Sequence, residues 1–277
     1  MKLVYLGTPE MAVPPLQALH AAGHEIVLVV TRVDKKRGRG GALSPSPVKA
    51  AAIELGLPVS HDPDDVILAV ERDGAELGVV VAYGRMIRPH ILGVIPMVNA
   101  HFSLLPRWRG AAPVERALLA GDSETGVCIM ALEEGLDTGG VYNCVTTPIT
   151  DDTIAAELRV RLVDIAADLL VQTLNTPLAE WIDTAEPQHG ETLYAAKFAK
   201  PDFEIDWAQP AEHVHRLIRV GGAWTTFRDK RLKIHAADLV DGVLVPTSVQ
   251  PEGKGPMDFA AWRNGAQPTA NELFGTL

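Results

Sequence analysis

Asn99, His101 and Asp137 are the residues of this sequence whose types could support chemistry together. Asn99 and His101 are two residues apart and follow the apolar run 94–98. If that run is a strand, both side chains point the same way where it ends. An amide beside an imidazole can polarise a carbonyl group and stabilise negative charge on its oxygen. Asp137, in the glycine-rich segment 135–140, would supply an acidic partner. The alternative is that Asn99 caps a turn and His101 is an ordinary loop histidine.

The segments around these residues predict an α/β domain with helices on both faces of its sheet. Apolar, β-branched runs indicate strands at residues 2–6, 25–31, 77–82, 125–132 and 141–147. Helical spacing of apolar residues indicates helices at residues 12–22, 48–55, 64–72, 113–120 and 153–175. Ligands of such sheets usually bind at the carboxyl ends of the strands. The first turn, Gly7-Thr-Pro9, lacks the G-x-G-x-x-G phosphate motif, which argues against a nicotinamide or flavin cofactor.

Length and composition indicate a globular protein of one or two domains. The chain has 277 residues and a formal charge of −10, which argues against a nucleic-acid binder that uses its whole surface. Residues 1–185 are expected to form the α/β domain and residues 186–206 a linker. Residues 207–277 are expected to form a small β-rich domain, with a helix at 210–220 and short strands at 232–236 and 243–245.

The cysteines and the apolar segments indicate a cytoplasmic protein. Cys128 and Cys144 provide neither a metal-ligand cluster nor a disulfide framework, and they fit a reducing compartment. No apolar run approaches the roughly 18 residues that are needed to span a bilayer. We therefore expect no membrane partner and no bound metal.

A basic, glycine-rich segment, residues 32–46, is named the flap here. Its single acidic residue, Asp34, is accompanied by five basic ones: Arg32, Lys35, Lys36, Arg37 and Arg39. Loops of this length are usually functional or disordered, and we expect no regular structure in it. Ser46 would cap a helix that has Pro47 at its first position. Such a charge run is either a solvated face or a contact for phosphate groups.

Short motifs are distributed along nearly the whole chain. They are Gly7-Thr-Pro9, Gly38-Arg-Gly40, Ser44-Pro-Ser-Pro-Val-Lys49, Val80-Val-Ala-Tyr-Gly84, Asn99-Ala-His-Phe-Ser-Leu-Leu-Pro106, Arg109-Gly-Ala-Ala-Pro113, Gly135-Leu-Asp-Thr-Gly139, Asp206-Trp207 and Val249-Gln-Pro-Glu-Gly-Lys254. In this order they resemble the methionyl-tRNA formyltransferases, part of the 10-formyltetrahydrofolate-dependent formyltransferase family. The motifs of residues 99–106 and 135–139 are shared by the wider family, whereas those of residues 38–49 and 250–254 are narrower and point to the tRNA enzyme.

The resemblance implies a Rossmann-like formyltransferase domain followed by a small, abbreviated β-barrel (OB-like). It implies an enzyme that transfers the formyl group of 10-formyltetrahydrofolate, its co-substrate, to the α-amino group of methionyl initiator tRNA in translation initiation. Asn99 and a protonated His101 would then stabilise the oxyanion, and Asp137 would accept the proton of the amine. The implied donor site consists of Tyr83, Gly84, Ser103, Leu104, Leu105 and Pro106. The implied tRNA contacts are Lys36, Arg37 and Arg39, on a protein expected to be a monomer.

The chain departs from the family pattern in two places. The flap reads Val33-Asp-Lys-Lys-Arg37 where the family usually has prolines, and residues 238–246 lead almost directly into the tail motif, where the family has further strands. Two alternatives stay open: a small-molecule N-formyltransferase that acts on an amino sugar nucleotide, and a non-catalytic folate- or RNA-binding relative. The first would need the same three residues but no basic flap. We also expect the flap to become ordered only when RNA binds.

Overall fold

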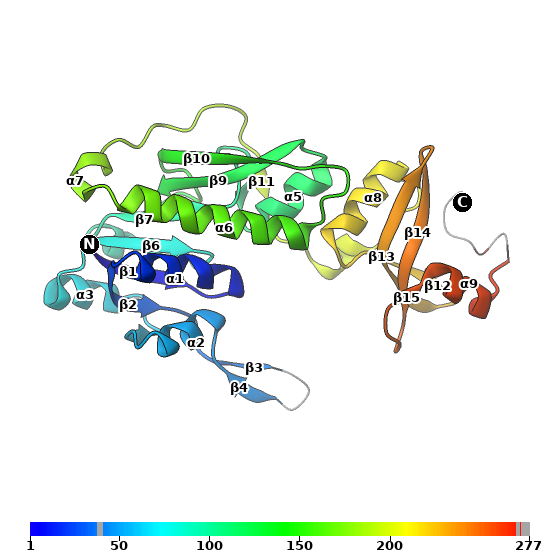
Figure 1. The fold of residues 1–277 in the computed structure, drawn as a ribbon, viewed down its shortest axis with the longest axis horizontal. Coiled ribbons are helices and arrows are strands. Elements are labelled where there is room, and N and C mark those ends of the chain that lie inside the picture. Colours follow the sequence, from blue (N-terminus) through cyan, green and yellow to red (C-terminus); the bar gives the residue numbers. More distant parts are fainter. Residues whose placement is uncertain (38–40, 270–271, 273–277) are drawn as a thin grey trace. The chain divides into compact units, whose positions relative to one another are not determined.

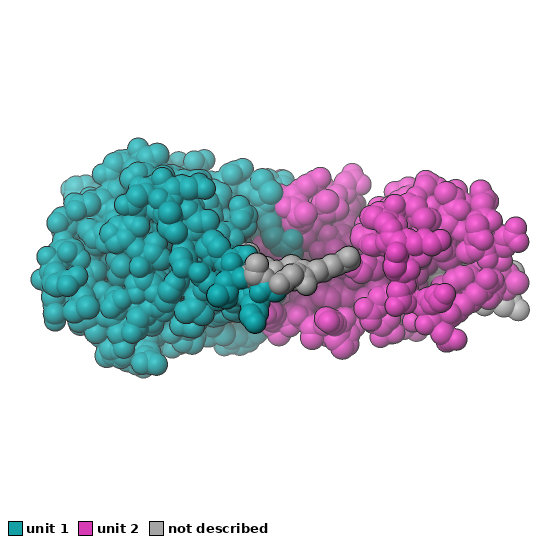
Figure 2. Space-filling view, turned by 90° about the horizontal axis from the view of Figure 1, so that it is seen from below, with its two compact units in different colours: residues 1–113, 125–147, 159–195 teal, residues 114–124, 148–158, 196–277 magenta. Residues whose placement is uncertain are grey.

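The computed structural model describes residues 1–37, 41–269 and 272, which form two compact units. The first unit consists of residues 1–113, 125–147 and 159–195, and the second of residues 114–124, 148–158 and 196–277 (Figure 2). The second unit therefore takes two segments from the middle of the chain in addition to the C-terminal part. The linker boundaries expected at residues 185 and 206 stay a prediction.

A seven-stranded sheet forms the centre of the first unit, in the order β10-β9-β7-β6-β1-β2-β5 (Figure 1). Its strands are β1 (Lys2–Gly7), β2 (Glu25–Val30), β5 (Val59–Ser60), β6 (Leu77–Val81), β7 (Met97–His101), β9 (Glu124–Ala131) and β10 (Val141–Pro148). Strand β1 pairs in parallel with β2 and β6, β2 with β5, and β6 with β7, whereas β9 is antiparallel to β7. This confirms the expected Rossmann-like α/β class.

Helices pack on both faces of this sheet, because successive strand residues point to opposite sides and nearly all residues of the central strands β1 and β6 are buried. On one side, the Tyr5 hydroxyl donates to the carbonyl oxygen of Ala12 at 2.6 Å, in the turn before α1. On the other side, Val4 belongs to an apolar cluster with Val66 of α3 and Ile91 of α4. The helices outside the C-terminal part are η1 (Glu10–Ala12), α1 (Val13–Ala21), α2 (Pro47–Glu54), α3 (Asp65–Asp73), α4 (Pro89–Leu92), α5 (Pro113–Ala120), α6 (Ala155–Leu174) and α7 (Leu178–Trp181).

The apolar run 94–98 is not the strand that the sequence predicted. Helix α4 ends at Leu92, Val94 is exposed, and strand β7 begins only at Met97. Pro96 has no N–H group to donate to a strand ladder, so the strand begins after it. Asn99 and His101 therefore lie within β7, at its carboxyl end, rather than beyond the strand.

The flap contains a β-hairpin, so the expectation that it has no regular structure is wrong. Strand β3 (Lys35–Arg37) pairs with β4 (Ala42–Ser44) in antiparallel register. Gly41 has a φ of 63°, which a hairpin turn can require and which glycine adopts without strain. Arg39 lies outside the described residues. The predicted cap is confirmed, because the Ser46 hydroxyl accepts a hydrogen bond from the Lys49 amide at 3.0 Å, at the start of α2.

A four-stranded antiparallel sheet lies in the second unit, in the order β12-β13-β14-β15. After residue 195 the elements are η2 (Lys200–Phe203), α8 (Ala211–Val220), β12 (Trp224–Phe227), β13 (Lys230–Val240), β14 (Val243–Pro251), β15 (Met257–Asp258) and α9 (Phe259–Ala266). Leu217 of α8, Ile234 of β13 and Trp262 of α9 share one apolar core. Strands β13 and β14 are longer than expected, because Asp241 and Gly242, both with positive φ, form a two-residue turn that keeps them paired to their ends.

The two cysteines form a disulfide, although the sequence predicted no disulfide framework. Cys128 on β9 and Cys144 on β10 are joined by a disulfide, because these strands are neighbours in the sheet. The inference of a reducing compartment from the cysteines therefore loses its basis. Within the described part of the chain, none of the helices combines the length and the apolar character of a membrane span.

Candidate active site

The strand β7 places Asn99 and His101 at the carboxyl end of the sheet. Asn99 pairs with Val80 of β6 and Met130 of β9, and His101 pairs with Cys128 of β9. Both side chains lie on the same face of β7 because strand residues alternate. They are buried, with 9% of Asn99 and 5% of His101 exposed.

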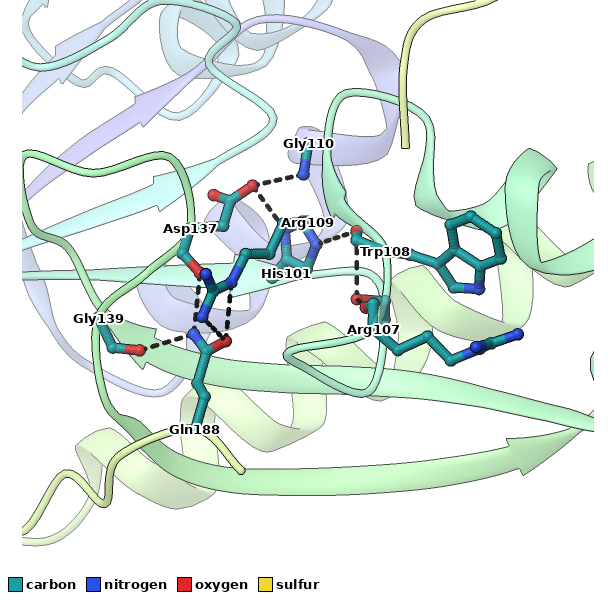
Figure 3. A network of polar contacts seen from close by, with 9 residues as sticks. His101, Arg107, Trp108, Arg109, Gly110, Asp137, Gly139 and Gln188 are labelled. Atoms are coloured by element: carbon teal, nitrogen blue, oxygen red, sulfur yellow. Dashed lines mark hydrogen bonds and ion pairs between the residues drawn. The ribbon is translucent and has the colours of Figure 1, made fainter. Parts of the chain in front are cut away.

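Asp137 lies beside His101, as the sequence predicted. Its Oδ2 atom is 3.8 Å from Nδ1 of His101 and accepts a hydrogen bond from the main-chain N–H of Gly110 at 2.7 Å (Figure 3). Only 6% of the His101 side chain and 13% of the Asp137 side chain are exposed, so solvent screens this pair only weakly. The structure thus brings His101 and Asp137 together although they are 36 residues apart in the chain. Asn99 lies on the same face of the strand as His101.

The second ring nitrogen of His101 faces a main-chain carbonyl. Nε2 lies 3.0 Å from the oxygen of Trp108. A carbonyl oxygen only accepts hydrogen bonds, so Nε2 carries a proton. A protonated ring can also donate from Nδ1 toward Asp137, whereas a neutral ring presents a lone pair there. The ring therefore lies between a main-chain carbonyl at Nε2 and a carboxylate at Nδ1.

The segment after β7 supplies the main-chain partners of both side chains, which are the Trp108 carbonyl for His101 and the Gly110 N–H for Asp137. Ser103 is buried, and its hydroxyl donates to the carbonyl oxygen of Arg107 at 2.6 Å, which closes the turn. Trp108 and Gly110 have positive φ values of 62° and 114°. The predicted donor-site residues Ser103, Leu104, Leu105 and Pro106 form this turn.

Tyr83 and Gly84, also predicted to line the donor site, follow the carboxyl end of the neighbouring strand β6. The Tyr83 side chain is buried, and burial raises the pKa of its phenol while the charge of Arg85 opposes that rise. The phenol therefore stays neutral near pH 7. The carbonyl oxygen of Gly84 accepts a hydrogen bond from the Arg32 guanidinium at the base of the flap.

Arg109 and Gln188 belong to the same network, although the sequence did not single them out as site residues. The Gln188 amide bridges the Arg109 guanidinium and the main chain of the Asp137 loop (Figure 3). Two short strands, β8 (Arg109–Gly110) and β11 (Tyr194–Ala195), pair in parallel and bring the segment of Gln188 to the site. Gln188 lies in the expected linker, residues 186–206, and no local periodicity marked it as a site residue.

Two of the flap residues expected to contact tRNA lie on the β3–β4 hairpin. Lys36 and Arg37 are on β3, and the Lys36 side chain is exposed. At the base of the hairpin, Nζ of Lys49 contacts both carboxylate oxygens of Asp34, at 2.8 and 2.9 Å. Among residues 1–37, 41–269 and 272, no group of three or more His, Cys, Asp or Glu side chains is placed to hold a metal ion.

Comparison with known proteins gives a consistent result for both parts of the chain. The family described as "Formyl transferase" matches residues 1–174, and "Formyl transferase, C-terminal domain" matches residues 197–243. A methionyl-tRNA formyltransferase of Symbiobacterium thermophilum is 41% identical over 96% of this chain and 92% of its own length. One of Clavibacter sepedonicus is 42% identical over 96% of this chain and 97% of its own length. The fold resembles the solved methionyl-tRNA formyltransferase from Clostridium thermocellum, with a TM-score of 0.61 at 14% identity, over 92% of this chain and 100% of that one.

Proposed function

Because this chain belongs to the formyltransferase family and matches methionyl-tRNA formyltransferases along nearly its whole length, it formylates methionyl initiator tRNA, and we propose that Asn99, His101 and Asp137 carry the transfer. The proposed roles of these three residues rest on the contact between His101 and Asp137 at the carboxyl end of β7. The identity of about 40% to enzymes of that one activity disfavours the small-molecule and non-catalytic alternatives.

The proposed reaction is an acyl transfer from 10-formyltetrahydrofolate, used as a co-substrate. The α-amino group of the methionine attacks the formyl carbon, and the carbonyl oxygen becomes an oxyanion. The Asn99 amide and a protonated His101 donate to this oxygen. Asp137 accepts the proton that the amine loses, directly or through a water molecule. The bond between the formyl carbon and the folate nitrogen then breaks, that nitrogen takes up a proton, and tetrahydrofolate leaves.

His101 must change one of its hydrogen bonds during this reaction. In the structure, its Nε2 proton points at the Trp108 carbonyl oxygen. We propose that the formyl oxygen replaces this carbonyl as the acceptor while Asp137 stays at Nδ1. The negative charge that develops on the oxyanion makes it the stronger acceptor.

The donor and the tRNA are proposed to bind on different parts of the chain. Ser103, Leu104, Leu105, Pro106, Tyr83 and Gly84 would line the donor, since they follow the carboxyl ends of the two adjacent strands β6 and β7. The tRNA phosphates would be contacted by the flap residues Lys36, Arg37 and Arg39. These basic residues are concentrated in one segment, whereas the chain as a whole has a net charge of −10. Lys230, Arg231 and Lys233 on β13 would add contacts from the second unit. We further propose that the protein acts as a monomer in the cytoplasm.

The proposed substrate is tested by offering one preparation several acceptors in parallel. These are initiator tRNA charged with methionine, elongator tRNA charged with methionine, and an amino sugar nucleotide, each with 10-formyltetrahydrofolate. We expect rapid formylation of the initiator species only. Formylation of the amino sugar at a higher kcat/KM would contradict the proposal, and absence of formyl transfer to every acceptor would favour a binding role.

A further inference from the structure

We propose that Gln188 is a positioning residue for the formyl transfer, since its amide fixes the Asp137 loop against the segment that contains Arg109 and Gly110. The inference rests on the proposed catalytic role of Asp137. Gln188 lies 51 residues after Asp137 in the chain, and its side chain is half-buried. It touches none of the groups proposed to react, so any effect on catalysis passes through the residues that it holds.

The Gln188 amide uses all of its hydrogen-bonding positions. Its Nε2 atom donates to the main-chain carbonyl oxygens of Asp137 and Gly139, both at 2.8 Å. Its Oε1 atom accepts from Nε and Nη2 of Arg109, at 3.0 and 2.7 Å (Figure 3). The orientation of the amide follows from these partners, because carbonyls only accept and a guanidinium only donates. Only an uncharged amide satisfies both sides at once.

The Asp137 loop has a conformation that needs support from outside. Asp137 has a φ of 52°, in the left-handed region that residues with a side chain rarely adopt. Such a conformation persists where surrounding contacts hold it. Gly139 is packed closely as well, since a Cβ atom there would come within 2.0 Å of the carbonyl oxygen of Ala131. Gln188 therefore clamps a loop that is strained at one end and tightly packed at the other.

The same amide also links the two segments that place the Asp137 carboxylate. Arg109 is the neighbour of Gly110, whose N–H donates to Oδ2 of Asp137 at 2.7 Å. Movement of the loop relative to this segment would change both that bond and the 3.8 Å distance to Nδ1 of His101. A shift of about 1 Å at a reacting group can cost on the order of a hundredfold in rate. Gln188 is thus placed to control the geometry of the acid–base pair.

Two substitutions change the hydrogen bonds of Gln188 while keeping a side chain of similar size. Gln188→Met removes the hydrogen bonds without adding charge, and Gln188→Glu keeps a partner for Arg109 but turns an oxygen toward two carbonyls. For both we expect kcat to fall about tenfold or more, with the KM values for charged tRNA and donor within about twofold of wild type. The matched control is Gln172→Glu, at an exposed position on α6 of the same unit, which should leave kcat unchanged.

A double-mutant cycle with Asp137→Asn decides whether Gln188 acts through Asp137. Gln188→Met should lower kcat about tenfold in the wild-type chain but less than about twofold in the Asp137→Asn chain. The proposal is overturned if the two effects multiply, if Gln188→Met retains wild-type kcat, or if both Gln188 variants lose the native circular dichroism spectrum. Wild-type kcat in Asp137→Asn alone would instead refute the proposed role of Asp137, so the two failures are distinguishable.

Discussion

The imidazole of His101 is oriented by the main chain of Trp108, seven residues away, whose carbonyl oxygen lies 3.0 Å from Nε2. Trp108 has a φ of 62°, so its peptide points in a direction that an ordinary turn would not give. At Nε2 the ring orientation therefore depends on the backbone of the turn after β7. On the other side of the ring, Asp137 faces Nδ1.

Replacement of His101 by alanine should remove transition-state stabilisation and leave the fold intact. We expect kcat for formylation to fall by roughly a hundredfold or more, as for loss of an oxyanion donor in other enzymes. Single-turnover formylation at saturating donor measures this directly. His20→Ala, on α1, is a control that should keep wild-type turnover. Near-normal turnover of the His101 variant would show that the assignment is wrong.

Neutralising the basic residues of the flap should weaken the use of tRNA selectively. With Lys36, Arg37 and Arg39 all replaced by alanine, the KM for charged tRNA should rise and its dependence on salt should flatten. The slope should change by about 0.7 to 0.9 log units for each phosphate group that the flap no longer neutralises. The KM for the donor should not change. Equal salt slopes for the variant and the wild type would place the flap outside the tRNA interface.

The ion pair at the base of the flap should affect tRNA binding more than chemistry. Lys49 and Asp34 are partly exposed, with 22% and 33% of their side chains accessible. Because such a pair contributes at most about 1 kcal/mol, Asp34→Asn should raise the KM for charged tRNA only about two- to fivefold. Steady-state kinetics at fixed salt provides the measurement. The exchange variant Asp34→Lys with Lys49→Asp should recover part of the loss, and no recovery would argue against a role of the pair itself.

His215 should make the second unit less stable in mild acid. Burial lowers the pKa of this histidine from its usual value of 6.5, and the charge of Arg219 lowers it further. The unfolded chain then binds the proton more readily than the folded chain, so the contribution to stability is present above about pH 6.5 and is lost as the pH falls toward the folded pKa. We expect the Tm to drop between about pH 7.5 and pH 5.5.

The variant His215→Gln tests that cause. Its amide can still donate to the carbonyl oxygen of Ala237, the partner of Nε2 at 3.0 Å, but it does not titrate. The drop in Tm should therefore become smaller than in the wild type. His235→Gln, at an exposed position of β13, is the matched control and should keep the wild-type pH dependence. An unaltered drop in the His215 variant would assign the acid sensitivity to another group.

The sequence predicted the parts of this molecule that local patterns determine. The strands and helices of the sheet follow from apolar runs and helical spacing, and their ends match within two residues for those expected at 2–6, 77–82 and 113–120. Asn99 and His101 could be recognised because their spacing fits one face of a strand. The length of the β13–β14 hairpin was underestimated, since register shifts near Ala236 interrupt its alternation.

Interactions between distant segments could not be predicted in this way. The Gln188 amide donates to main-chain carbonyls 49 and 51 residues earlier in the chain. Because every residue has such a carbonyl, the sequence does not indicate which ones the amide binds. The disulfide between Cys128 and Cys144 depends on the strand order and not on the number of cysteines. The hairpin in the flap has arms of only three residues, too short to give a periodic signal.

The division of the chain has a consequence for recombination between relatives. The second unit contains residues 114–124 and 148–158 as well as everything after residue 195. Within it, Nε of Arg216 on α8 donates to the carbonyl oxygen of Leu119 at 3.0 Å, and Nη1 of Arg219 donates to that of Thr150 at 2.9 Å. A crossover near residue 195 would combine the C-terminal part of one parent with segments 114–124 and 148–158 of the other. Such a crossover separates the arginine donors on α8 from their main-chain acceptors, so a recombinant keeps these hydrogen bonds only if the new tail has arginine at positions 216 and 219.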